Sequence, residues 1–406
     1  MTLLDDARPL AGGLTDLRHT LHRRPEVGLE LPRTRDTVLE ALDGLDLEIT
    51  TGRSCTSVTA VLRGGAPASA GQGVVLLRAD LDALPVHEEV DVPYRSDVDG
   101  LMHACGHDLH ATMLVGAARL LAAHRDRLAG DVVLMFQPGE EGWDGASYMI
   151  REGVLDAAGR RPDAAFALHV LSNLTGRGVV ATRPGPLMAA SDGLFVTVRG
   201  RGGHGSTPHG ARDPIPAACE MVLALQTAMT RRLDPFAPAV LTVGTFHAGT
   251  RRNIIPDDVV FEATVRTFDP AVRASIAGFA REVCEGVASA HGVDVDVRYE
   301  AEYPVTVNDP DQARFAMDVA GRLLGTDAVV RLANPMTGSE DFSRVCAEVP
   351  GAMLFLGAVV DGRDPSAAPT NHSPRAAFDD RVLPVGAALY AQLALARLDA
   401  GTEGRS

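Results

Sequence analysis

The chain has 406 residues, of which 46% are hydrophobic, and this length predicts two globular domains rather than one core. Its formal net charge of −15 argues against a phosphate-binding surface, so we expect no nucleic-acid partner. All 38 basic residues are arginine, and the lack of lysine excludes enzymes that need a Schiff-base, pyridoxal-anchoring or phosphate-loop lysine.

The first half of the chain alternates helices with apolar strands. Apolar residues at helical spacing predict helices over residues 10–23, 34–45 and 110–124. Short apolar runs predict strands over residues 57–63, 73–79, 131–137 and 164–169, and the second run is continuous enough to be buried on both faces. This alternation is typical of an α/β layer with a largely parallel sheet.

From about residue 190 the order of elements changes. Strands are predicted over 193–199, 239–246, 259–267 and 293–299, with helices over 213–232 and 270–291. This β-α-β-β-α-β order is that of a ferredoxin-like α+β domain. After Pro304 the first pattern resumes, with helices over 312–324 and 384–398 and a strand over 351–356. We therefore expect an α/β domain of residues 1–187 and 302–406, interrupted by an inserted domain of residues 188–301.

Membrane insertion and export are not expected. No apolar run reaches the roughly 18 residues that span a bilayer, and no basic segment followed by an apolar stretch begins the chain. A cytoplasmic location follows as the expectation. The cysteines are odd in number and far apart, which argues against a disulfide framework and allows one of them a metal or catalytic role: Cys55, Cys105, Cys219, Cys284 and Cys346.

Acidic and imidazole residues stand where predicted strands end. Ligands bind at the carboxyl ends of strands in an open α/β sheet, so these side chains are expected to converge. They are Asp80, Asp82, Glu140, Glu141 and His169, with Cys105 and His107 just before a helix and His372 in a late loop. One thiolate among imidazoles and carboxylates suits zinc or a related first-row ion better than calcium or magnesium. Of two adjacent glutamates, one can bind metal while the other transfers a proton.

A series of motifs runs through almost the whole chain in one order: residues 21–26, 78–85, 102–110, 137–142, 203–209, 252–256, 338–342 and 371–374. In these motifs the chain resembles the amidohydrolase branch of the M20 metallopeptidase clan, which includes aminoacylase-like enzymes, hippurate hydrolases and indoleacetyl-amino-acid hydrolases. The resemblance implies a zinc-peptidase-like catalytic domain interrupted by a ferredoxin-like lid and dimerisation domain. It also implies a homodimer or homotetramer formed through that lid.

The resemblance assigns the metal centre residue by residue. Two divalent ions (zinc, manganese, cobalt or nickel) would be held by Cys105, His107, Glu141, His169 and His372. Cys105 stands where related peptidases have a bridging aspartate, so a bridging thiolate is expected. Glu140 matches the catalytic base. Asp80 and Asp82 match a histidine ligand and its orienting aspartate in the peptidases. Here they would orient the metal ligands without binding metal themselves.

Three residues of the inserted domain match substrate-contacting positions. His204 and Asn253 would stabilise the oxyanion of the tetrahedral intermediate, His204 from the partner subunit. Arg266 would pair with the substrate carboxylate, although an arginine within a strand is more often part of a structural ion pair. The implied reaction is hydrolysis of a small N-acyl amino acid to a carboxylic acid and a free amino acid.

Three other functions are alternatives to this one. A dipeptidase or carboxypeptidase of the same clan is disfavoured by Cys105 and by the missing strand-end histidine. A cysteine amidase would use Cys105 as nucleophile beside a histidine, and stoichiometric metal analysis separates it from a metalloenzyme. A non-catalytic metal- or ligand-binding protein is disfavoured because Glu140, the candidate base, is present.

Overall fold

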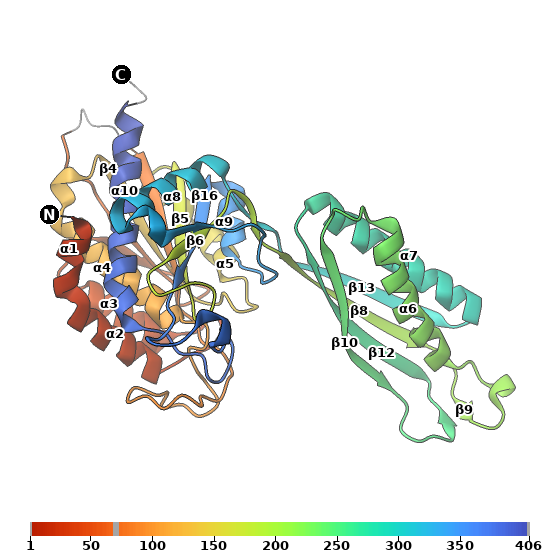
Figure 1. Cartoon of the computed structure of the whole chain (residues 1–406). Coiled ribbons are helices and arrows are strands. Elements are labelled where there is room, and N and C mark those ends of the chain that lie inside the picture. The colour runs from red at the N-terminus through yellow and green to blue at the C-terminus, as the bar shows by residue number, and fades with distance from the viewer. Residues whose placement is uncertain (1, 68–72, 404–406) are drawn as a thin grey trace. The chain divides into compact units, whose positions relative to one another are not determined.

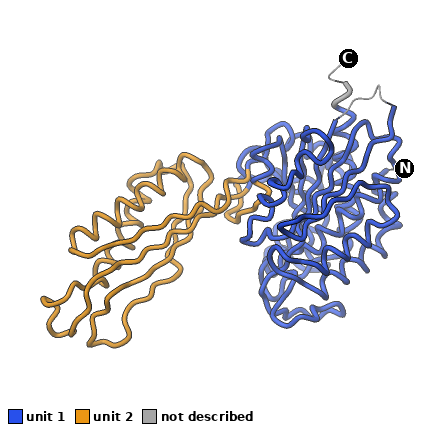
Figure 2. The backbone as a smooth tube through the Cα atoms, turned by 180° about the vertical axis from the view of Figure 1, so that it is seen from behind, with its two compact units in different colours: residues 1–187, 307–334, 344–406 blue, residues 188–306, 335–343 orange. Residues whose placement is uncertain are grey.

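The computed structural model describes residues 2–67 and 73–403. The chain divides into two compact units (Figure 2). Unit 1 comprises residues 1–187, 307–334 and 344–406, and unit 2 comprises residues 188–306 and 335–343. The second boundary therefore lies five residues beyond the one expected at 301/302, and a later segment joins unit 2. Each unit is described below by itself.

Unit 1 is built on one mixed sheet with strand order β1-β2-β4-β3-β5-β16-β6-β15. At its centre β3 is parallel to both β4 and β5, and β5 is parallel to β16. The flanking pairs β2–β4 and β16–β6 are antiparallel. The strands are β1 (Glu48–Thr51), β2 (Val58–Leu62), β3 (Gly73–Asp80), β4 (Gly130–Gln137), β5 (Ala164–Leu171), β6 (Val180–Thr182), β15 (Val329–Arg331) and β16 (Gly351–Gly357). The expected mixed, largely parallel α/β sheet is thus confirmed, and β3 is buried along almost its whole length, as its apolar run predicts.

Helices cover this sheet, and two of them lie deep in the core (Figure 1). Helix α4 (His107–Ala123) is buried along nearly its whole length and packs against α10 (Leu383–Glu403), and both contact β3 and β5. The other helices are α1 (Leu3–Ala7), α2 (Ala11–Arg23), α3 (Pro32–Leu42), α5 (Gly145–Arg151), α8 (Pro310–Leu324) and α9 (Phe342–Glu348). This packing brings the start of α4 beside the carboxyl end of β5.

Helix α10 belongs to a long apolar segment. The segment Asp380–Ala400, which includes most of α10, is long and apolar enough to span a membrane, and 67% of its apolar window is buried within the structure. A buried core helix passes the same test of length and composition, so this segment does not by itself indicate a membrane span. The burial comes from packing against α4 in the core of unit 1.

Unit 2 has a four-stranded antiparallel sheet in the order β10-β12-β8-β13. Its elements are β8 (Ala190–Arg199), α6 (Pro214–Arg232), β10 (Ala239–Ala248), β12 (Asp258–Thr267), α7 (Pro270–His291) and β13 (Asp294–Tyr303). A small ribbon pairs β9 (Gly203–His204) with β11 (Ile254–Ile255). A further ribbon, of β7 (Gly185–Met188) and β14 (Thr306–Asn308), consists mostly of unit 1 residues. The chain order β-α-β-β-α-β is the one expected for this region.

Three helices begin with the same dipeptide. Asp213, Asp269 and Asp309 each precede a proline, and each carboxylate accepts a hydrogen bond from a backbone N–H of the first helical turn. The proline at the first helical position loses no hydrogen bond, because that N–H has no partner within a helix. The Asp-Pro pairs therefore set the starts of α6, α7 and α8 locally, and this explains why the sequence predicts these helices well.

Candidate metal centre

The predicted site residues of unit 1 lie at the carboxyl ends of its central strands. Asp80 ends β3 and Asp82 follows it, while Glu140 and Glu141 follow β4. His169 lies near the end of β5. The remaining ligands come from outside the sheet, Cys105 and His107 at the start of α4 and His372 in a loop before α10. The expected convergence at this edge of the sheet is what the structure shows.

Five predicted ligands form two groups that share one residue. Cys105, His107 and His169 offer ligand atoms within 4.8 Å of one another, and so do Cys105, Glu141 and His372. The Cys105 Sγ atom lies 3.4 Å from His169 Nε2 and 3.3 Å from His372 Nε2. A thiolate common to both groups can bridge two ions, and a set of thiolate, imidazole and carboxylate suits borderline first-row metals.

The hydrogen bonding within the cluster leaves ligand atoms available. Both ring nitrogens of His107 and the Oε1 atom of Glu141 are buried without a hydrogen-bond partner among the described residues. His372 Nε2 does approach Glu141 Oε1 to 3.0 Å as an ion pair, but the contact lacks hydrogen-bond geometry. Buried polar atoms without partners are costly, and divalent ions would satisfy them. The residues present therefore fit the two ions that the donor set suggests.

His169 is held in a form that can bind metal. Its Nδ1 atom donates to the carbonyl of Val170 at 2.8 Å, because a carbonyl oxygen can only accept. The proton is thus on Nδ1, and Nε2 presents a lone pair toward Cys105. Burial, together with the nearby His110, lowers the pKa of His169 well below its ordinary value, which keeps the ring neutral.

His372 sits in an unusual backbone conformation. Its φ of 69° lies in the left-handed region, where a residue with a β-carbon is strained. A hydrogen bond from the His372 N–H to the Ala104 carbonyl, at 3.0 Å, stabilises this backbone conformation. The hydrogen bond to Cys105 and the ion pair with Glu141 raise the pKa of His372 to about 10 in the absence of metal. Its side chain is 54% exposed, so this ligand lies at the open side of the cluster.

Gly106 explains how α4 reaches the site. Its φ is 85°, and a β-carbon at this position would come within 2.5 Å of the Val170 side chain. Only glycine combines this backbone conformation with such a close approach to β5. Because Gly106 ends the preceding turn, α4 begins at His107 rather than at His110 as expected. Cys105 and His107 are thereby placed on either side of one tight turn.

Asp82 shapes the turn that carries the two glutamates. Its Oδ1 atom accepts from the Glu140 N–H and its Oδ2 atom from the Glu141 N–H, both at 3.0 Å. Asp82 Oδ1 also lies 3.5 Å from His107 Nδ1, and Glu140, Glu141 and His107 have ligand atoms within 4.8 Å of one another. Asp82 therefore contacts the turn and the cluster together, in keeping with the orienting role expected for it.

A network of buried polar residues connects the first turn of α4 to α2. Asp108 accepts from Arg18 at 2.9 Å and pairs with His22 at 2.8 Å, and His22 also contacts Glu88 at 3.1 Å. Burial disfavours the carboxylate, but Arg18 and His22 outweigh it and hold the pKa of Asp108 well below its ordinary value. Nothing in the sequence indicated Arg18, because its partner is distant along the chain.

Asn371 is another residue of the site that was not predicted from the sequence. Its amide group donates to the Cys105 carbonyl at 3.1 Å and to the Val170 carbonyl at 3.0 Å. Its Oδ1 atom accepts from the Ser172 N–H at 3.0 Å. One side chain thus links the Cys105 turn, the end of β5 and the loop of His372. Its position next to His372 in the motif was the available signal.

The three substrate-contacting candidates lie in unit 2. His204 is exposed on β9, where its Nδ1 atom contacts the Ser206 hydroxyl at 2.8 Å. The backbone carbonyl of Asn253 accepts from the Gly205 N–H at 2.9 Å. Arg266 is half-buried on β12 and donates to the Ser191 hydroxyl at 2.6 Å. His204 and Asn253 are therefore neighbours within unit 2, whereas Arg266 already has a structural partner.

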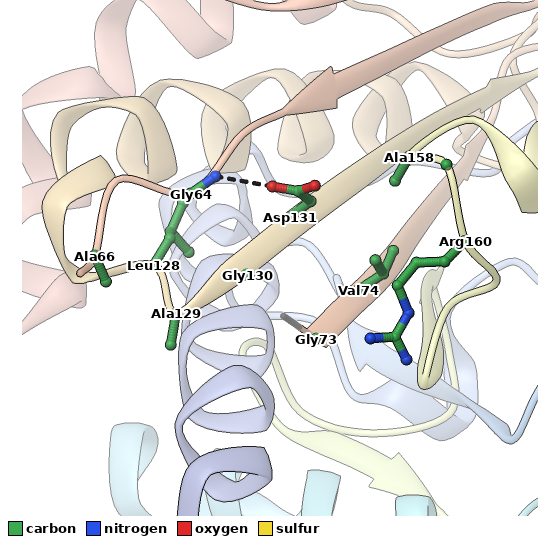
Figure 3. A pocket seen from close by; sticks show the side chains of 11 residues that line it. Gly64, Ala66, Gly73, Val74, Leu128, Ala129, Gly130, Asp131, Ala158 and Arg160 are labelled. Carbon is green, nitrogen blue, oxygen red and sulfur yellow. Dashed lines mark hydrogen bonds between the residues drawn. The ribbon is translucent and has the colours of Figure 1, made fainter. Parts of the chain in front are cut away.

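A hollow at the opposite edge of the unit 1 sheet offers no comparable chemistry (Figure 3). It lies at the amino ends of β3 and β4 and is lined by Gly73, Gly130 and Asp131 among others. The Asp131 carboxylate accepts from the Gly64 N–H at 3.0 Å and from Arg63 at 2.7 Å, so its charge is already balanced. This hollow therefore does not compete with the metal cluster as the functional site.

Known proteins resemble this chain over nearly its full length. The model of peptidase family M20/M25/M40 matches residues 76–396. Thermostable carboxypeptidase 2 of Saccharolobus solfataricus is 37% identical over 397 residues, covering 97% of both chains. Hippurate hydrolase of Campylobacter jejuni is 35% identical over 395 residues, covering 97% of this chain and 99% of that one.

A solved structure has the same architecture. The dinuclear metal-binding peptidase of the M20 family from Bacillus subtilis matches with a TM-score of 0.81 and 30% sequence identity, covering 96% of this chain and 99% of that one. Its described dinuclear centre agrees with the two groups of ligand atoms that share Cys105 here.

Proposed function

The chain belongs to peptidase family M20/M25/M40, and on that premise we propose that it is a metal-dependent amidohydrolase that cleaves N-acyl amino acids. The products would be a carboxylic acid and a free amino acid. The observation that carries the proposal is the pair of ligand groups sharing Cys105, with Glu140 beside them. A relative named hippurate hydrolase, matched along nearly its whole length, supports an acylated amino acid as substrate.

The roles of the residues follow from where they lie. Two divalent ions, when bound, supply Lewis acidity and acidify water to a pKa of about 7. Cys105, His107 and His169 would hold one ion, and Cys105, Glu141 and His372 would hold the other. Cys105 acts in this proposal as a ligand, and the nucleophile is water.

Glu140 is proposed to move the proton. It is 6% exposed, lies in the turn held by Asp82 and is adjacent to the ligand Glu141. It would take a proton from the attacking water and return it to the departing nitrogen. His204 and Asn253 are proposed to stabilise the oxyanion and Arg266 to bind the substrate carboxylate. The bond from Arg266 to Ser191 is the alternative, structural role for that arginine.

A substrate panel after metal removal tests this function. The chain is stripped with a chelator, reloaded separately with zinc, manganese, cobalt or nickel, and assayed on N-acetyl and N-benzoyl amino acids and on dipeptides. We expect no hydrolysis by the stripped chain and recovery on N-acyl amino acids after reloading. Full activity without metal, together with loss on alkylation of Cys105, would instead establish a cysteine amidase.

A carboxypeptidase activity is the second candidate. It is favoured by the 37% identity to a protein named thermostable carboxypeptidase 2. Free peptides and the same peptides blocked at the amino terminus separate the two activities. Faster release of the C-terminal residue from longer peptides than from N-acyl amino acids would support the carboxypeptidase.

Assembly and location are also proposed. Unit 2 exposes β10 at the edge of its sheet, and large apolar side chains project nearby, with Phe236 94% and Leu223 69% exposed. An unpaired edge with exposed apolar groups supports a homodimer or homotetramer formed through unit 2. Light scattering on the chain and on a Phe236→Glu variant tests this, and a monomeric parent chain would contradict it. A cytoplasmic location remains a prediction.

A further inference from the structure

Strand β5 extends beyond its neighbour β3 at the metal centre. The two strands pair only from Val75–Ala164 to Arg78–Ala167, whereas β5 continues to Leu171. Alternate residues of a strand direct their N–H groups to the same side, so residues 168 and 170 face the edge that β3 has left. Buried N–H groups without a ladder partner need another acceptor.

Two side chains supply these acceptors. The Leu168 N–H donates to the Tyr390 hydroxyl at 2.7 Å, and the Val170 N–H donates to His110 Nε2 at 2.7 Å. The Tyr390 hydroxyl in turn donates to the Arg78 carbonyl at 2.6 Å. Both capped residues flank His169, but only the His110 ring contacts the His169 ring, and only Val170 accepts a hydrogen bond from the His169 side chain.

The hydrogen bonds of His110 determine its tautomer. Because the Val170 N–H is a donor, His110 Nε2 must carry a lone pair and the proton must be on Nδ1. That proton is donated to Asp80 Oδ1 at 2.5 Å. Asp80 is itself fixed by Arg78, whose guanidinium donates to Oδ2 at 2.7 Å. The ring of His110 is therefore held at both nitrogens and is fully buried.

This arrangement argues against His110 as a ligand in its own right. Asp80, His107 and His110 do place candidate ligand atoms within 4.8 Å of one another. The Nε2 lone pair of His110, however, is occupied by the Val170 N–H, and its Nδ1 atom carries a proton. His110 has no electron pair left for an ion.

The same peptide segment holds His169 from its other side. The Val170 carbonyl accepts from His169 Nδ1 at 2.8 Å and from Asn371 at 3.0 Å. His110 also contacts His169 directly, with ring centroids 4.6 Å apart in an edge-to-face arrangement. The orientation of His169 toward Cys105 thus depends on where the Val170 backbone is held.

We infer that His110 is a positioning residue of the metal centre: it clamps the Val170 backbone so that His169 presents Nε2 to the ion, and Asp80 serves to set the tautomer of His110. The inference rests on the proposed function only in requiring that His169 binds metal. It gives Asp80 a role in this chain without a bond to metal.

Three substitutions separate the two hydrogen bonds of His110. His110→Gln can keep an acceptor near the Nε2 position for Val170, His110→Asn can keep a donor near Nδ1 for Asp80, and His110→Phe keeps the shape but neither bond. We expect His110→Asn and His110→Phe to weaken binding of one ion by about tenfold to a hundredfold, as for other residues that orient metal ligands. His110→Gln should lose less.

The matched control is Tyr390→Phe. It removes the neighbouring cap on the same edge of β5 without touching the support of His169. We expect it to lower the melting temperature of the metal-free chain while leaving metal affinity within about twofold of the parent. The His110 variants should show the converse, a clear loss of affinity at a similar or smaller loss of melting temperature.

Metal affinity is measured by competition with a chelator, and the cobalt(II) absorption spectrum reports the coordination of the His169 side. Neither measurement needs a substrate. If the parent chain binds no divalent ion, the proposed function fails. If the parent binds two ions and His110→Phe binds both with parental affinity and spectrum, the positioning role alone is overturned. A His110→Asn chain that binds like the parent while His110→Gln does not would also overturn it.

Discussion

The two ends of the unit 1 sheet are formed by the same strands but differ in what they bury. At the carboxyl ends, His107 and Glu141 keep buried polar atoms without hydrogen-bond partners among the described residues. At the amino ends, Gly73 and Gly130 approach so closely that a β-carbon on Gly130 would lie 2.2 Å from the Gly73 carbonyl, and Asp131 is already paired. Unsatisfied polar groups destabilise a fold, so they persist where a ligand completes them.

The largest expected effect comes from removing the base at the carboxyl end. Glu140→Gln should lower kcat by about 10²- to 10⁴-fold, because a positioned general base contributes that much. Metal content should stay at the parental level. Glu141→Gln is the matched control, since the same change one residue later should reduce metal content. Equal metal loss in both variants would contradict the division of roles between the two glutamates.

Metal removal should lower the stability of the folded chain through the carboxyl ends of the unit 1 strands, where the ions are proposed to bind. An ion present at a hundredfold excess over its Kd stabilises the folded chain by about 2.7 kcal/mol per site. We therefore expect the melting temperature to fall on chelation and to rise with added zinc or manganese in calorimetry. The Cys105→Ala chain, which lacks the atom shared by both groups, should show no such rise. A metal-dependent rise in that variant would mean that the ions bind elsewhere.

A smaller effect is expected from the aspartate behind the glutamate turn. Asp82→Asn replaces one of two acceptors by a donor that opposes a backbone N–H of the turn. Activity and metal affinity should each fall by about tenfold to a hundredfold, as for other groups that orient a metal site. Steady-state kinetics and chelator competition measure the two quantities. Parental values in both would show that the turn keeps its shape without Asp82.

The smallest effect is expected for the same substitution at the amino end. Asp131 also accepts a backbone N–H, from Gly64 at 3.0 Å, and its side chain is 25% exposed. Asp131→Asn should lower the free energy of unfolding by about 1 kcal/mol, because a partly exposed ion pair is screened by solvent. Activity and metal affinity should not change. A loss of metal affinity here would break the contrast between the two ends.

Much of the fold was predictable because its signals are local. The burial of β3 follows from its apolar run, and the starts of α6, α7 and α8 follow from Asp-Pro pairs. The short strands β6 and β15 were missed because three residues carry no clear periodicity. The start of α4 was misplaced because it depends on the left-handed Gly106 against Val170, a contact between distant segments.

The sequence by itself determined which residue types stand at the strand ends, and its motifs named Cys105, His107, Glu141, His169 and His372 as candidate ligands. Only the tertiary structure decided that Cys105 belongs to both ligand groups, that Asn371 links the Cys105 turn to the end of β5, and that His110 takes the place of a missing strand partner. Periodicity and capping act within a few residues, whereas a lone pair or a tautomer depends on partners brought from distant parts of the chain.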